Sequence, residues 1–197
     1  MHYIVILTFF WSMSLNAAEM KDVSIGLGVF DQYVAKVQTN RGGDTNKLDY
    51  QIFLVADGEF ALNKQFSLIP RLSLVKPGHT RDANTEKFVW WASGEVGYNM
   101  GDFLFHSGLG LMMTYISSKG GTVALPNGTG TDNFFLPDGE STSRNVIYLL
   151  GLDYFITKEW SARPQLHVVN PFNSRNRAFS YTLSASYHFY DKFWSSK

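Results

Sequence analysis

Cysteine is absent from the chain, and charged residues make up only 17% of its 197 residues. The lack of cysteine excludes disulfides and thiolate metal sites, and it is compatible with an oxidising compartment. The charges sum to a formal net charge of zero, which gives no argument for nucleic acid as a partner. Aromatic residues reach 16%, nearly as many as the charged residues, and this mixture is a poor one for a water-facing surface.

The N-terminal apolar stretch, Tyr3 to Trp11, is too short to cross a bilayer as a helix. Small residues follow it, with Ala17 and Ala18 placed just before Glu19. This order predicts a secretory signal peptide over residues 1–18, although its start carries His2 rather than lysine or arginine. A first buried strand is the alternative. Residues 19–197 are expected to form one domain.

Apolar and polar residues alternate with a period of two along most of the chain, which predicts β-strands. The expected strands cover residues 23–37, 48–62, 66–75, 88–98, 103–116, 145–156, 160–169 and 179–189. Long and short connections alternate between them, and no stretch has a convincing helical pattern. This order predicts an all-β, eight-stranded, antiparallel up-and-down meander, which hides its edges by closing into a barrel.

Lysine is missing from the last seven predicted strands and occurs only in turns, loops and the tail. Their polar faces carry mainly Ser, Thr, Gly, Asn and Gln, whereas a strand face in contact with water usually carries several charges. Aromatic residues also gather near both ends of the strands, as in the belts of membrane interfaces. The apolar face is therefore expected to contact lipid. A soluble lipocalin-like carrier, with the apolar face around a ligand, is the alternative.

These features resemble the small eight-stranded bacterial outer-membrane barrels of the OmpA/OmpX type. The last strand ends with Tyr187-His188-Phe189, which is similar to the aromatic-terminated assembly signal of that family. The chain departs from the family pattern because it continues to Lys197. The resemblance implies a transmembrane barrel in the outer membrane, with tight turns in the periplasm and long loops outside the cell.

The tight turns predict which charged residues face one another inside the barrel. Leu62 opposite Phe66 would place Asp57 across from Arg71, and Ile156 opposite Trp160 would place Asp153 across from Arg163. Tyr98 opposite Phe103 would place Glu95 across from His106. Since buried charges must be paired, these six residues are expected to form a salt-bridged plug in a barrel too narrow to conduct. A gate or proton path through the lumen is the alternative, and Arg71→Ala is expected to leave Asp57 unpaired.

Candidate catalytic residues are few. Some eight-stranded outer-membrane barrels are lipid A deacylases with a His-x-Ser motif on the seventh strand. Here His167 is suitably placed, but Val169 stands at the position of the nucleophile, and the alternation points His167 inward, opposite Leu149. No hydroxyl is evident within its reach. His106 and His188 are interpreted as interior histidines with partners. No spacing predicts a metal site or another cofactor.

The longest predicted break, residues 117–143, contains the apolar cluster Phe134, Phe135 and Leu136. Long loops in compact domains are usually functional or disordered, so this cluster is expected either to fold over the barrel mouth or to meet a partner.

The sequence therefore predicts a non-enzymatic, monomeric outer-membrane protein that supports the envelope or binds an unknown extracellular ligand. Its other expected partners are outer-membrane lipid, lipopolysaccharide and the barrel-assembly machinery. A lipid A-modifying enzyme and a narrow channel are the remaining alternatives.

Overall fold

The computed structural model describes residues 19–32, 50–76, 78–79, 85–126, 130–135 and 138–189. Its strands are β1 (Glu19–Gln32), β2 (Tyr50–Ala61), β3 (Phe66–Val75), β4 (Gly78–His79), β5 (Thr85–Met100), β6 (Phe103–Lys119), β7 (Thr122–Pro126), β8 (Thr131–Phe135), β9 (Asp138–Phe155), β10 (Trp160–Val169) and β11 (Ala178–His188). Within these ranges, no helix is long and apolar enough to cross a membrane.

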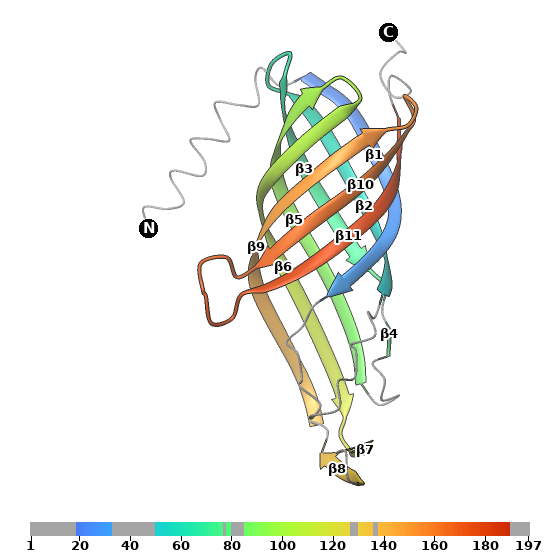
Figure 1. The fold of residues 1–197 in the computed structure, drawn as a ribbon, viewed down its shortest axis with the longest axis vertical. Helices are drawn as coiled ribbons and strands as arrows, with labels where there is room; N and C mark the ends of the chain where they lie inside the picture. The colour runs from blue at the N-terminus through green and yellow to red at the C-terminus, as the bar shows by residue number, and fades with distance from the viewer. Residues whose placement is uncertain are drawn as a thin grey trace.

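Eight of these strands form a closed antiparallel barrel, as the sequence predicts (Figure 1). Their order around the wall is β3, β2, β1, β11, β10, β9, β6 and β5, and pairing of β3 with β5 closes the ring. β1 pairs with both β2 and β11, so the first and last strands meet and leave no open edge along the barrel. The short strand β4 pairs with the outer end of β5.

Large apolar side chains cover the outer face of the wall. Leu27 is 57% exposed and Leu183 is 55% exposed, although water would strongly disfavour such a surface. On the same strands, the alternate residues Ser24, Ser184 and Ser186 point inward and are buried. The predicted lipid-facing orientation of a transmembrane barrel is therefore confirmed, and the lipocalin-like arrangement is wrong.

Two of the three predicted hairpin registers are correct. Asp57 lies opposite Arg71, and the Ile156 amide donates to the Trp160 carbonyl at 2.9 Å. The predicted register of β5 with β6 is wrong by two residues, because Met100 and not Tyr98 lies opposite Phe103. The two-residue turn between them depends on Gly101, whose φ of 68° suits glycine best. Glu95 consequently lies opposite Gly108 rather than opposite His106.

The predicted break over residues 117–143 is also wrong in its extent. β6 continues to Lys119 and β9 begins at Asp138, and these two residues lie opposite each other. The hairpin of β7 and β8 follows at the far end of this extension (Figure 1). The paired segments are rich in serine and threonine, and residues 138–144 are exposed throughout. Because both faces of residues 138–144 are exposed, this segment lacks the apolar alternation that reveals a strand.

Several predictions fall outside the described residues. These are the signal peptide over residues 1–18, the ends of the first and second predicted strands at residues 33–37 and 48–49, Leu136, and the tail from residue 190 onward. Phe189 follows the last residue of β11, and its amide donates to the Val23 carbonyl at 2.9 Å.

Candidate functional site

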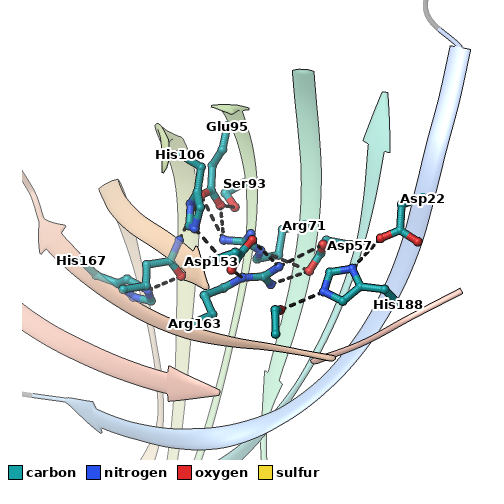
Figure 2. A network of polar contacts seen from close by, with 12 residues as sticks. Asp22, Asp57, Arg71, Ser93, Glu95, His106, Asp153, Arg163, His167 and His188 are labelled. Carbon is teal, nitrogen blue, oxygen red and sulfur yellow. Dashed lines mark hydrogen bonds and ion pairs between the residues drawn. The ribbon is translucent and has the colours of Figure 1, made fainter. Parts of the chain in front are cut away.

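The structure brings all six predicted interior residues into one polar cluster near the middle of the lumen (Figure 2). Their side chains are between 0% and 7% exposed. They come from six different strands: Asp57 from β2, Arg71 from β3, Glu95 from β5, His106 from β6, Asp153 from β9 and Arg163 from β10. The cluster therefore joins six of the eight strands of the wall, all except β1 and β11.

Arg163 binds two carboxylates from different parts of the wall. Its Nε and Nη2 donate to the two oxygens of Asp153, the latter at 2.9 Å, and its Nη1 donates to Asp57 Oδ2 at 2.6 Å. Asp153 lies on the neighbouring strand β9, but β2 is separated from β10 by β1 and β11. The contact with Asp57 thus crosses the lumen, and sequence register alone does not reveal it.

Arg71 has a different main partner from the predicted one. It donates from Nη1 to both oxygens of Glu95, at 2.8 and 3.0 Å, whereas its Nε lies 3.5 Å from Asp57 Oδ2. Asp57 is held more closely by Arg163. The expectation that Arg71→Ala leaves Asp57 unpaired is therefore wrong, because Glu95 would lose its guanidinium and Asp57 would keep one.

Glu95 is the most densely bonded acid of the cluster. Besides Arg71, it contacts His106 Nδ1 at 2.6 Å and accepts from Ser93 Oγ at 2.8 Å and Gln165 Nε2 at 3.0 Å. His106 lies opposite Gly97, two residues from Glu95 along β5, so the contact between His106 and Glu95 is a diagonal one. Ser93 and Gln165 were not predicted, although their alternation with Glu95 and Arg163 places them on the inward face.

The charges of the cluster nearly balance. Three carboxylates (Asp57, Glu95 and Asp153) face two guanidinium groups (Arg71 and Arg163), so the formal charge is −3 + 2 = −1 when the His106 imidazole is neutral. The His106 ring lies between two of the acids, 2.6 Å from Glu95 and 3.8 Å from Asp153. The ring therefore links the carboxylate that Arg71 binds with the one that Arg163 binds.

His167 points into the lumen opposite Leu149, as the alternation predicts. Its Nε2 lies 3.1 Å from Gln165 Oε1, and its ring packs edge-on against Trp91 at 5.1 Å between centroids. Its Nδ1 has no hydrogen-bond partner among the described residues. A base for nucleophilic catalysis needs a hydroxyl within reach, and the contacts of His167 supply an amide and an aromatic ring instead.

A second polar cluster lies near the tight turns and contains His188, which is an interior histidine with partners, as predicted; the partners themselves, Ser161 and Asp22, were not predicted. His188 Nε2 lies 2.8 Å from Ser161 Oγ, and His188 Nδ1 lies 2.5 Å from Asp22 Oδ2 (Figure 2). A β-bulge between Met20 and Asp22 lets Asp22 point inward. The connectivity is that of a hydroxyl, a base and an orienting acid, but Ser161 is only 1% exposed. A reacting carbonyl could not reach it in this conformation.

An apolar layer fills the lumen beyond the ionic cluster, on the side of the long loops. Its members are Phe30, Phe53, Val55, Val75, Val89, Trp91, Met112, Ile147, Leu149 and Val169. The Trp91 ring on β5 lies 5.1 Å from Phe30 on β1 and 5.4 Å from Phe53 on β2, two strands that are not paired with β5. This layer was not predicted, because the inward face of the strands was expected to be polar. The signal for it is a run of apolar residues on both faces near the loop end of strands such as β2 (Ile52 to Val55) and β9 (Val146 to Leu149).

The predicted apolar loop cluster lies on the outer hairpin. Phe134 and Phe135 belong to β8 and lie opposite Val123 and Thr122 of β7. Leu136 is outside the described residues. Across the described ranges of the chain, no group of three histidine, aspartate or glutamate side chains could hold a metal ion.

Comparisons with known proteins agree with this architecture. No protein family and no curated protein matches the sequence. Among solved structures, the chain is similar to Ail, the attachment invasion locus protein of Yersinia pestis, with a TM-score of 0.50 and 10% identity over 86% of this chain and 98% of that one. It is also similar to the N-terminal β-barrel domain of Pseudomonas aeruginosa OprF (TM-score 0.47, 11% identity, 87% and 100% covered) and to Neisserial surface protein A (0.46, 13%, 88% and 99%). The likeness to Ail and the closed eight-stranded wall together show the fold of the small outer-membrane β-barrels.

Proposed function

We propose that this chain is a non-enzymatic integral protein of the bacterial outer membrane, in which a rigid barrel carries binding segments at the cell surface. A signal peptide over residues 1–18 would direct it to the periplasm, where the assembly machinery would insert it as a monomer. The barrel itself would support the envelope, and the extracellular partner would bind to the segments beyond the membrane.

The observation that carries this proposal is the filled lumen. An ionic layer of six side chains spans the middle of the barrel, and an apolar layer around Trp91 lies next to it on the side of the long loops. Contacts such as Arg163–Asp57 and Trp91–Phe30 join opposite walls. Eight strands leave an interior only wide enough for side chains, so this barrel is suited to be a scaffold rather than a pore.

The shape of the wall supports a role at the cell surface. β5, β6 and β9 are the longest strands, with 16, 17 and 18 residues, and they continue past the ends of their neighbours (Figure 1). The extension ends in the β7–β8 hairpin, which carries Phe134 and Phe135. Binding residues often lie on such segments above a rigid framework.

The narrow channel and the lipid A-modifying enzyme have less support. A channel would need a continuous opening through both the ionic and the apolar layer. An enzyme of the deacylase type would need a nucleophile beside His167, facing the lipid, but His167 is buried inside against Gln165 and Trp91. Neither arrangement agrees with the contacts in the lumen.

The first experiment is to express the full chain in a Gram-negative host and to compare unboiled with boiled membrane fractions by gel electrophoresis. We expect the protein in the outer-membrane fraction and a heat-dependent change in migration, because a closed barrel resists detergent until it is heated. Purified protein in planar bilayers should give no steady conductance. A soluble periplasmic protein without a shift in migration would contradict the proposal, and regular single-channel steps would favour the channel.

A further inference from the structure

The connection between β10 and β11, residues 170–177, has an unusual composition for a surface loop. Its sequence is NPFNSRNR, which contains two arginines, one phenylalanine and no acid. Phe172 is 83% exposed, the highest value among the exposed large hydrophobic side chains of the described residues. Arg175 and Arg177 are exposed as well. A single exposed ring is common on protein surfaces, but a ring combined with two arginines and no acid suits the headgroup region of a membrane.

Hydrogen bonds hold this loop in place, so Phe172 is presented by a defined backbone. The Asn170 amide donates to the Val146 carbonyl at 2.8 Å, and Asn170 Nδ2 donates to Asn145 Oδ1 at 2.8 Å. Within the loop, Arg177 Nη2 donates to the Pro171 carbonyl at 2.8 Å. Asn170 has a φ of 52°, a conformation that asparagine tolerates better than most residues.

The loop begins where the apolar outer wall ends. Val168 lies opposite both Tyr148 and Phe179, and the two aromatic side chains are exposed on the outer surface. They form the kind of aromatic row that lies at a membrane interface. Figure 1 shows the loop between β10 and β11 projecting sideways from the wall, while the extension of β5, β6 and β9 continues along the barrel. The loop therefore leaves the wall at the level of the interface.

A third cation lies beside this loop. Arg144 is exposed on β9, two residues beyond the outward-facing Val146, and it precedes Asn145, which holds the loop. Three guanidinium groups and one aromatic ring are thus gathered at one rim of the barrel. Arginine binds phosphate with two parallel hydrogen bonds, and an aromatic ring is stable at the boundary between headgroups and acyl chains.

We propose that residues 170–177, together with Arg144, form a docking site for anionic lipid in the outer leaflet. Phe172 enters the boundary between headgroups and acyl chains, and Arg144, Arg175 and Arg177 bind lipid phosphates. The site fastens one side of the barrel rim to the membrane and leaves the β5–β6–β9 extension free of the surface. This inference rests on the proposed placement of the barrel in a membrane.

The absence of native cysteine allows a direct test with single spin labels. Three variants of the full chain, Phe172→Cys, Leu183→Cys and Ser141→Cys, are labelled with a nitroxide and placed in phosphatidylglycerol vesicles. Leu183 lies on the apolar outer wall and Ser141 on the exposed extension, so they mark hydrocarbon and water. The accessibility of each label to oxygen and to a water-soluble nickel chelate gives its depth.

We expect the label at position 172 to lie between the two reference positions. Adding Arg144→Gln, Arg175→Gln and Arg177→Gln should raise its accessibility to nickel at least twofold, with no change at position 183. Vesicles of phosphatidylcholine should give a similar rise. The unchanged label at position 183 serves as the control that the barrel is still folded and inserted.

Two results would overturn the inference, and they differ from failure of the proposed function. A label at position 172 that is as accessible to nickel as the one at position 141, while position 183 lies in hydrocarbon, would place the loop in water, ready for a soluble partner. A label at position 172 that lies at the interface but does not respond to loss of the arginines would exclude phosphate binding. A water-accessible label at position 183 would instead contradict the membrane placement itself.

Discussion

Replacing Arg163 with methionine should destabilise the barrel more than any other single change in the ionic cluster. Arg163 supplies hydrogen bonds to both oxygens of Asp153 and to Asp57. After its removal, Asp57 still has Arg71 at 3.5 Å, but Asp153 has only His106 at 3.8 Å. The buried Asp153 carboxylate is then left almost without compensation, and this sets the size of the effect.

The magnitude follows from two opposing contributions. At about 3 Å and an effective dielectric constant of about 20, each guanidinium–carboxylate pair is worth about 5 kcal/mol of Coulomb energy. Desolvation of the charges cancels much of this gain in the intact protein, but the carboxylate remains desolvated after the arginine is removed. Removing one partner of a buried ion pair typically lowers the free energy of unfolding by about 3–5 kcal/mol. We expect Arg163→Met to lower the free energy of unfolding by this amount.

The measurement is urea-induced unfolding in lipid vesicles, followed by tryptophan fluorescence and by the gel shift. Arg163→Lys should cost less, because an ammonium keeps the charge but cannot bind both carboxylates with a planar fork. Adding Asp153→Asn to Arg163→Met should recover part of the loss, since it removes the uncompensated charge. An unfolding free energy of Arg163→Met within about 0.5 kcal/mol of the parent, the usual range for neutral surface changes, would refute this account.

Two further predictions concern the lumen. Gly151→Ala should lower the free energy of unfolding by about 1–3 kcal/mol in the same assay, because a methyl group at Gly151 would lie 2.2 Å from His106 Cε1. Gly94→Ala is the matched control, since its added methyl group meets no atom within 4 Å, and equal losses for both variants would contradict the explanation. Ser161 should remain unmodified when the folded barrel is incubated with a fluorophosphonate, because it is 1% exposed despite its contact with His188. An adduct on Ser161, found by mass spectrometry and lost with His188→Gln, would reveal an accessible nucleophile instead.

The fold was predictable because alternation and turn spacing are local properties of the sequence. The two-residue period identified the inward face, and the turns beyond Leu62 and Ile156 fixed two hairpin registers. The β5–β6 register could not be fixed in this way, because it depends on the positive φ of Gly101. The outer segment of β9 was missed because both of its faces are exposed over residues 138–144, so it carries no apolar alternation.

The interior network was predictable only between neighbouring strands. The pairing of Asp153 with Arg163 follows from one hairpin register, and so does the position of Asp57 opposite Arg71. The bond from Arg163 to Asp57 depends on how the closed wall brings β10 toward β2, which no local pattern encodes. Asp22 was missed for a related reason, because a bulge sets its direction.

We expect the ionic layer to help fix the register of the strands, an effect that a stability measurement alone would not reveal. Near the loop end, inward residues such as Phe53 and Trp91 are apolar, and so are their outward neighbours Leu54 and Trp90. A strand that is apolar on both faces can slip by one residue and exchange its faces at little cost. The same strands carry charged residues nearer the tight turns, such as Asp57 and Glu95. These residues oppose the slip, because it would turn a charged side chain toward lipid.

Replacing all six charged or titratable residues of the layer with apolar residues of similar volume separates their effect on stability from their effect on strand register. The folded fraction should be about as stable as the parent, since complete apolar replacement of buried ion pairs is often neutral or stabilising by about 1–4 kcal/mol. The yield of folded barrel, measured by the gel shift after refolding into vesicles, should nevertheless fall several-fold because alternative registers compete. A full yield of the replaced protein would show that the apolar pattern and the turns already select the register without the charges.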